Sequence, residues 1–331
     1  MKFKSWSLFA TLLLTSLSSA HVFTVTDLGP NVGAVSINDY GQVAENRLAS
    51  DGVTVRAGVW RKNDGFKPLA KLPGATSTYA VKINNHGDVV GSSAINGVSH
   101  ATLWLSTGRV KDLGGLFTSL DSFADDINDS RIVTLSGFLD ILPGFNVFVW
   151  SERMGLVAIG EGGAGYIDAF GNVAGSFDKG NMYLWSRFSG RRLVELPDGG
   201  VAGIDSGYVL AFSTFTGVPF SIDEALLYNL RNGRRLFLGL LPLDGQPGFE
   251  EESIPGGLNS FKQVVGGSFP DRRGWLWTPW TGILDLNHLT NAPAWQLFSG
   301  SAINNKTQIV GQGSLNDIPH AFLLTFRSRR R

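Results

Sequence analysis

The chain has 331 residues, is 43% hydrophobic and 17% charged, and balances 28 basic against 28 acidic residues. This length allows a large core, and a formal net charge of zero predicts neither nucleic-acid binding nor attraction to a membrane surface. The absence of cysteine excludes disulfides and thiolate chemistry, and 42 glycines with few charges favour short strands joined by tight turns over helices.

The chain opens with the features of an export signal. Lys2 and Lys4 precede a short apolar run, and small residues follow up to Ala20. The run is too short for a transmembrane anchor. We therefore expect residues 1–20 to be a signal peptide. The remaining 21–331 should form one domain of a secreted or periplasmic protein, with no membrane span after cleavage.

A pattern of about 44 residues then recurs along the mature chain. Its first half is clearest at Tyr79–Gly91, and the seven copies centre on Asn38, Asn84, Asn128, Asp168, Asp205, Asn259 and Asn304. Each copy is typical of a hairpin, because an alternating strand ends in an Asn or Asp that can close a turn on its own backbone. A glycine supplies the positive φ that such a turn requires. Three copies have Arg131, Lys262 or Thr307 near that position, so we expect their turns to differ.

The second half of the pattern predicts a second hairpin. Its third strand ends in an aromatic residue, and a glycine follows four or five residues later. The aromatic residues are Trp60, Trp104, Trp150, Trp185, Tyr228 and Trp277, and the glycines are Gly65, Gly108, Gly155, Gly190, Gly233 and Gly282. We expect these aromatic side chains to pack between neighbouring repeats rather than to bind a ligand.

Four short strands in every 40–50 residues are typical of an all-β, β-propeller fold. We predict about seven four-stranded blades, with six as the alternative because the central copies are weak. The last copy stops after its third strand, His320–Leu324, whereas Phe23–Gly29 matches a fourth strand that has no blade of its own. Pairing these two segments would close the ring and remove two exposed strand edges.

The combined pattern resembles the HAF-repeat family of extracellular bacterial proteins. The sequence contains Ile-Asn-(Asn/Asp)-x-Gly-x-Val-Val-Gly, the tripeptide His320-Ala321-Phe322 and a near copy, His100-Ala101-Thr102. This resemblance extends over essentially the whole mature chain. It implies export and a propeller-like repeat fold, and it implies no particular reaction.

Candidate ligand-binding residues lie mainly on one face of the expected propeller. The turns within each hairpin are short and form one face, and the long irregular connections form the other, where binding residues concentrate. These connections are Glu45–Arg56, Leu69–Thr78, Gly137–Asn146, Ser213–Glu224, Gly239–Ser253 and Asn287–Gly300. The candidates are Asp125 and Asp126 on an innermost strand, the acidic run Glu250, Glu251 and Glu252, and Trp295 in a long connection.

These residues leave two function classes open. The favoured class is a non-catalytic module that binds a glycan or a protein through the face formed by the long connections. The alternative is an extracellular polysaccharide hydrolase or lyase that uses paired carboxylates as acid and base. The same carboxylates could bind Ca²⁺ through oxygen ligands, but we expect no cofactor and no metal site. We also expect a monomer with a solvated basic tail at 327–331.

Overall fold

The computed structural model describes residues 22–117, 121–139, 141–142, 144–177, 180–195, 199–215, 222–242 and 252–327. The expected signal peptide, Glu250, Glu251 and the last four residues of the basic tail lie outside these ranges. Within them the chain forms strands β1 to β28, one 3-10 turn at Gly114–Leu116 and no α-helix. No helix among the described residues is therefore long and apolar enough to cross a bilayer.

Five sheets contain four strands each, and their strands follow one another in sequence order. We number the seven sequence repeats as units one to seven, and these sheets are units one to five. The first two are β2 (Val32–Ile37), β3 (Val43–Leu48), β4 (Val55–Arg61), β5 (Gly65–Pro68), and β6 (Ala75–Ile83), β7 (Val89–Ile95), β8 (Val98–Trp104), β9 (Val110–Asp112). The next is β10 (Ser122–Ile127), β11 (Val133–Phe138), β12 (Phe145–Ser151), β13 (Gly155–Glu161). The last two are β14 (Gly165–Ile167), β15 (Val173–Phe177), β16 (Asn181–Ser186), β17 (Gly190–Glu195), and β18 (Gly200–Asp205), β19 (Tyr208–Phe215), β20 (Ile222–Asn229), β21 (Arg235–Phe237).

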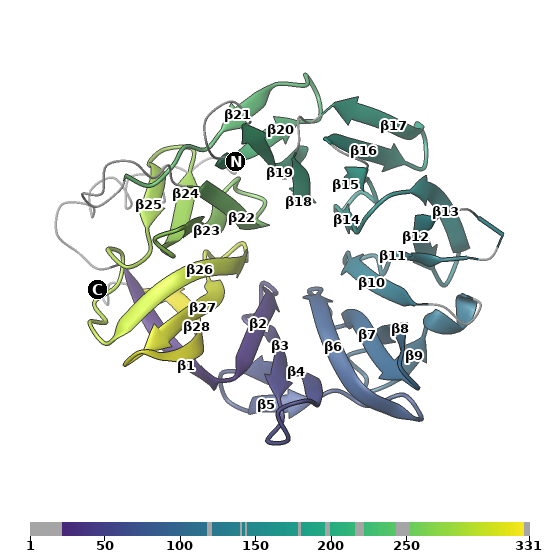
Figure 1. Ribbon diagram of the computed structural model, residues 1–331, viewed down its shortest axis with the longest axis horizontal. Coiled ribbons are helices and arrows are strands. Elements are labelled where there is room, and N and C mark those ends of the chain that lie inside the picture. The colour runs from purple at the N-terminus through teal and green to yellow at the C-terminus, as the bar shows by residue number, and fades with distance from the viewer. Residues whose placement is uncertain are drawn as a thin grey trace, which may run out of the picture.

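The remaining strands form a single eight-stranded sheet. It contains β22 (Glu252–Leu258), β23 (Val264–Phe269), β24 (Gly274–Thr278), β25 (Gly282–Asp285), β26 (Trp295–Ile303), β27 (Ile309–Leu315), β28 (Ile318–Phe326) and β1 (Phe23–Pro30). β1 pairs antiparallel with β28, from Phe23 opposite Phe326 to Pro30 opposite His320. Figure 1 shows the sheets arranged in a ring, with the first strand of each unit nearest the centre. The protein is an all-β propeller with four-stranded blades.

The expectation of seven separate four-stranded sheets needs correction, because units six and seven are joined. A bridge between Gly267 of β23 and Ser299 of β26 connects them. A Cβ atom on Gly267 would lie 2.9 Å from Cβ of Ser299, and one on Gly256 would lie 2.1 Å from the carbonyl oxygen of Gly300. Glycine at these positions therefore lets the two units approach closely enough to share one sheet.

In six of the seven units the turn after the innermost strand is closed by an Asn or Asp side chain, as the sequence predicts. Unit five is the exception, because the Asp205 carboxylate accepts from the hydroxyls of Ser206 and Ser260 instead. In unit two, Oδ1 of Asn84 accepts hydrogen bonds from the backbone N–H of His86, at 3.0 Å, and of Asp88, at 2.9 Å. The expectation that three turns differ is wrong. Arg131, Lys262 and Thr307 have φ of 56°, 61° and 56°, the same left-handed region as Gly87 at 79°. The Asx hydrogen bonds fix the turn strongly enough to hold a non-glycine residue there.

The same asparagines also connect neighbouring units. The Nδ2 group of Asn38 donates to the carbonyl oxygen of Asn84 at 2.9 Å, and Asn84 donates to that of Asn128 at 3.2 Å. Asn304 donates to the carbonyl oxygen of Asn38 at 2.8 Å, across the two ends of the chain. In units four and five the position is Asp168 and Asp205, whose carboxylates cannot donate this bond.

Replacing Asn304 by aspartate is therefore expected to lower the free energy of unfolding by about 1–3 kcal/mol, because a buried carbonyl loses its donor. The carboxylate would keep the acceptor that closes the turn, as Asp168 does. Chemical denaturation measures the loss, and Asn232→Asp is the matched control because Asn232 is exposed and uses only its Oδ1, which accepts from Arg234 N. Equal stabilities of the two variants would contradict the role of Asn304 in joining the units.

The repeat aromatics lie in the core, as predicted. Trp104, Trp150, Tyr228 and Trp277 are buried, and each belongs to a cluster that includes residues of a neighbouring unit. Trp60 and Trp185 pack against similar clusters while partly exposed. The glycines that follow these aromatics all have positive φ, which is consistent with their predicted turn positions.

Candidate functional site

A central cavity of about 510 Å³ is lined by the innermost strands of all seven units. These strands are β2, β6, β10, β14, β18, β22 and β26, which converge on the middle of the ring in Figure 1. The lining continues into the turns that follow them, including Asp39, Asn85 and Asp129. The cavity therefore extends toward the face of short turns, and not toward the face of long connections that the sequence favours.

The cavity wall is chemically uneven at one repeat position. This position directly precedes the Ile or Leu that recurs at the end of the innermost strand in every repeat. It is occupied, from unit one to unit seven, by Ser36, Lys82, Asp126, Tyr166, Gly203, Gly257 and Ala302. One arc of the wall thus carries a hydroxyl, an ammonium, a carboxylate and a phenol, and the opposite arc carries only small residues.

Lys82 and Asp126 form the charged part of this wall. The Lys82 Nζ lies 3.8 Å from Asp126 Oδ1, with 46% of the lysine side chain exposed against 5% of the aspartate. Burial raises the pKa of Asp126 despite the opposing charge of Lys82, and burial likewise raises the pKa of Asp205 across the cavity. Lys82 is consequently an accessible hydrogen-bond donor beside the buried carboxylate of Asp126, and its charge also acts on the partly buried Asp205.

Asp125 and Asp126 hold the short strand β14 against unit three. A bulge between Ala124 and Asp126 lets both consecutive side chains reach unit four. Asp125 Oδ2 accepts from Gly165 N at 3.3 Å, and Asp126 Oδ2 accepts from Ile167 N at 3.1 Å. Asp125 also accepts from the Ser136 hydroxyl at 2.9 Å, and burial raises its pKa to about 7. Both carboxylates are therefore largely engaged by the fold.

Tyr166 adds a hydroxyl to the same arc. Burial first, and then the charges of Asp126 and Asp125, raises the pKa of its phenol to about 12. The group consequently stays protonated at neutral pH and can donate a hydrogen bond into the cavity. No hydrogen bond of its hydroxyl joins it to another described residue.

The other predicted site residues lie elsewhere. Glu252 begins β22 opposite Phe269, and burial together with Asp223 raises its pKa, but it does not line the central cavity. Trp295 begins strand β26 and is not in a long loop. Its ring packs edge-on against His320 and Phe322, at centroid distances of 6.0 and 6.3 Å. Glu250 and Glu251 lie outside the described residues.

A second hollow, of about 590 Å³, lies between units six and seven toward the long-connection face. Ile254 and Phe269 contribute apolar side chains that are 47% and 55% exposed, and the Arg272 guanidinium lies 4.6 Å from the centre of the Phe298 ring. Its polar side chains are those of Ser268, Arg272, Ser299, Ser301 and Gln312, and none of them is a carboxylate. Within the described residues, no three His, Asp or Glu side chains come together as a metal-binding set.

Sequence reasoning found Asp125 and Asp126 but missed Lys82, Tyr166 and Asp205. The signal that could have found them is the repeat alignment itself. Lys82 and Tyr166 occupy the position that differs from repeat to repeat, directly before the recurring Ile. Asp205 replaces the Asn that joins neighbouring units in other repeats. Positions where a repeat departs from its own pattern mark the cavity better than acidic runs do.

No family model and no curated protein sequence matches the chain. Solved structures do resemble it. A structure described as oligogalacturonate lyase in complex with manganese has a TM-score of 0.60 at 11% identity, over 92% of this chain and 93% of that chain. Virginiamycin B lyase from Staphylococcus aureus gives 0.58 at 9% identity, over 91% and 99%. The β-propeller domain of the Trilobed protease from Pyrococcus furiosus gives 0.56 at 11%, over 95% and 97%. At such identities these likenesses establish the fold alone.

Proposed function

We propose that the protein is an exported, non-catalytic binding module whose central cavity holds a glycan. The observation that carries this proposal is the uneven wall. Lys82 and Tyr166 offer donors, and the small residues opposite leave room for a ring. Asp126 and Asp205 each accept bonds within the fold and keep further lone pairs as acceptors. A sugar presents hydroxyls that both donate and accept, so it can use both kinds of group in one pocket. The basic, apolar and small-residue segments before His21 support export.

The proposal is tested by a glycan array with the full chain produced with its own leader, followed by calorimetry on any glycan retained. Lys82→Met is expected to weaken binding at least about tenfold, because a charged hydrogen bond is lost from a partly buried site. Lys67→Met is the matched control, since Lys67 pairs with Asp64 on the outermost strand β5. An array with no retained glycan, or Lys82→Met binding as tightly as the parent, would refute the proposal.

A hydrolase or lyase acting on an extracellular polysaccharide is the second candidate. The observation in its favour is Asp125, whose pKa of about 7 suits a general acid at neutral pH. Against it, the carboxylates of Asp125 and Asp126 are occupied by backbone and hydroxyl donors from neighbouring strands. Turnover of a uronic-acid polymer that is abolished by Lys82→Met and Asp125→Asn would favour the enzyme over the binding module.

We further propose that the eight-stranded sheet acts as two blades, so that seven blades closed by β1 surround the cavity. The support is that a single bridge joins β23 to β26, whereas the pairs within each unit extend over several residues. We also propose membership of the HAF-repeat family on the residues that carry the resemblance.

A further inference from the structure

The outer corner of units four and five, on the short-turn face, carries both arginines and exposed apolar side chains. Residues 186–195 and 229–237, which contain the two turns and outer strands β17 and β21, include six arginines and a single acidic residue, Glu195. The chain as a whole balances 28 basic and 28 acidic residues, so its zero net charge conceals a strongly basic corner.

Two phenylalanines project from turns of unit four on this face, Phe188 at the corner itself and Phe170 from the turn after the innermost strand. Phe188 is 98% exposed at the tip of the turn between β16 and β17, and Phe170 is 84% exposed in the turn between β14 and β15. Neither turn has an unusual backbone that requires phenylalanine, and a fully exposed aromatic ring gains nothing for folding. Leu193 and Leu236, on β17 and β21, are 55% and 50% exposed.

The arginines divide into those held by the fold and those that are free. Arg191 lies over the rings of Phe177 and Tyr183 and donates to the carbonyl oxygen of Glu161. Arg235 donates to the carbonyl oxygen of Glu195, which ties β21 to β17. The exposed side chains of the other four form no ion pair with any described residue; they are Arg187, Arg192, Arg231 and Arg234.

A small cavity of about 190 Å³ opens among these residues, between units four and five. Arg192, Ser186 and Ser189 line it, together with Asn172 and with Ile204 and Leu230. The two serine hydroxyls lie 2.7 Å apart and the turn holds them by a bond from Ser189 N to Ser186 Oγ. Arg192 and the one hydroxyl proton that the serine pair leaves free form a donor set suited to a phosphate group.

We propose that this corner docks the protein on an anionic phospholipid bilayer. The docking surface consists of Arg187, Phe188, Arg192, Arg231 and Arg234 of the corner, together with Phe170 on the same face. The small cavity receives the phosphate of a lipid headgroup, the free arginines meet the surrounding negative surface, and Phe188 and Phe170 enter the acyl boundary. Basic residues interleaved with exposed aromatic rings are the composition that the bilayer interface favours. The proposal is independent of the glycan site in the central cavity.

The first test is flotation of the full chain with vesicles of phosphatidylcholine containing 30 mol% phosphatidylglycerol, in parallel with pure phosphatidylcholine. Binding is expected only to the anionic vesicles and should fall sharply at 1 M salt, where the screening length is about 3 Å. Arg187→Gln combined with Arg231→Gln and Arg234→Gln should weaken binding on the order of a hundredfold, at about fivefold for each arginine. Phe188→Ser should weaken it about tenfold.

Two control variants change residues outside this corner, one on the face of long connections and one on strand β4. Ile141→Ser removes an equally apolar side chain, 83% exposed in the connection between β11 and β12, and Arg56→Gln removes an exposed arginine of β4. Neither should change binding. Equal binding to the neutral vesicles, or unchanged binding of Phe188→Ser and the triple variant, would overturn the proposal. So would retention on polygalacturonate beads without flotation, which would assign the corner to an acidic polysaccharide.

Discussion

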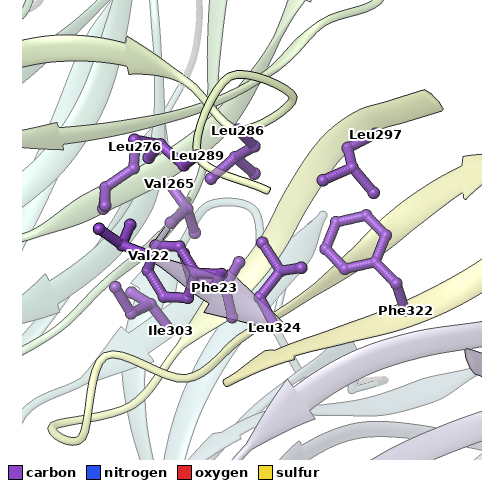
Figure 2. Packing of buried hydrophobic residues seen from close by; sticks show 11 residues of the cluster. Val22, Phe23, Val265, Leu276, Leu286, Leu289, Leu297, Ile303, Phe322 and Leu324 are labelled. Atoms are coloured by element: carbon purple, nitrogen blue, oxygen red, sulfur yellow. The ribbon is translucent and has the colours of Figure 1, made fainter. Parts of the chain in front are cut away.

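Replacing Phe23 by alanine is expected to lower the free energy of unfolding by about 3–5 kcal/mol, the usual cost of removing a buried phenylalanine ring. Phe23 is 1% exposed and lies at the start of β1, within a cluster that draws residues from β23 to β28 (Figure 2). Its ring meets that of Phe326 edge-on at 5.7 Å. Because β1 and β28 come from the two ends of the chain, losing this contact weakens the pairing of the chain ends as well as the core.

Urea denaturation of the parent and the variant measures the loss. Phe188→Ala is the matched control, since the ring is 98% exposed and its removal should change stability by less than about 0.5 kcal/mol. A loss below 1 kcal/mol for Phe23→Ala would mean that β1 contributes little to holding the sheet of units six and seven together.

Because the sequence pattern repeats, much of the fold could be predicted from the sequence. The Asn or Asp that closes the first turn in six units, and the aromatic and following glycine that end the third strand in six, are determined by local backbone geometry and burial. Such signals recur in every copy, so the strands and turns could be placed without a structure. Phe23–Gly29 is predicted to be a fourth strand because it matches the fourth-strand pattern of the other copies, and β1 does pair with β28.

Three features could not be read, for physical reasons. The turns at Arg131, Lys262 and Thr307 depend on side-chain hydrogen bonds that outweigh the cost of positive φ, and propensity does not report this balance. The joining of units six and seven depends on a close approach at Gly267, which only the packed ring specifies. The basic corner is formed by residues of two units, so a net charge summed over the chain conceals it.

The candidate site was only partly predictable for a related reason. Asp125 and Asp126 stood out as a pair of acids, but their hydrogen bonds to Gly165 and Ile167 arise from a bulge and a neighbouring unit. Lys82 belongs to a strand more than 40 residues earlier, and the packing of unit two against unit three brings it within 3.8 Å of Asp126. The sequence predicts a loop at Trp295 because nothing local shows that β26 begins there.

Glu45 is the clearest case of a residue whose burial could not be predicted from the sequence. It takes the place of the glycine in the Val-Val-Gly pattern, and the sequence predicts that it begins the long connection Glu45–Arg56. The structure places it inside β3 with its side chain fully buried. One carboxylate oxygen, Oε2, accepts two bonds from Arg47, and the other, Oε1, has no hydrogen-bond partner. Burial raises the pKa of Glu45 from 4.5 to about 7, against the opposing effect of Arg47.

Glu45→Gln is therefore expected to flatten the dependence of stability on pH. A carboxyl whose pKa is higher in the folded state holds its proton longer there than in the unfolded chain, so its contribution is greatest below pH 4.5 and is lost as the pH rises through 7. The rise from 4.5 to about 7 corresponds to a loss of about 3 kcal/mol. Glutamine cannot ionise, so the variant should lose less stability between pH 5 and pH 8 than the parent, by about 2–3 kcal/mol.

Urea titrations at pH 5, 6, 7 and 8 measure this difference. Asp125 contributes in the same direction, because burial raises its pKa to about 7 as well, so the parent and Glu45→Gln should both still decline, and Glu45→Gln combined with Asp125→Asn should be flatter than either single variant. Glu152→Gln is the control: Glu152 is exposed, its hydrogen bond from Lys111 lowers its pKa, and its removal should leave the decline in place. Parallel pH profiles for the parent and Glu45→Gln would show that Arg47 keeps Glu45 ionised in the folded protein, and the buried ion pair would then be a fixed part of unit one.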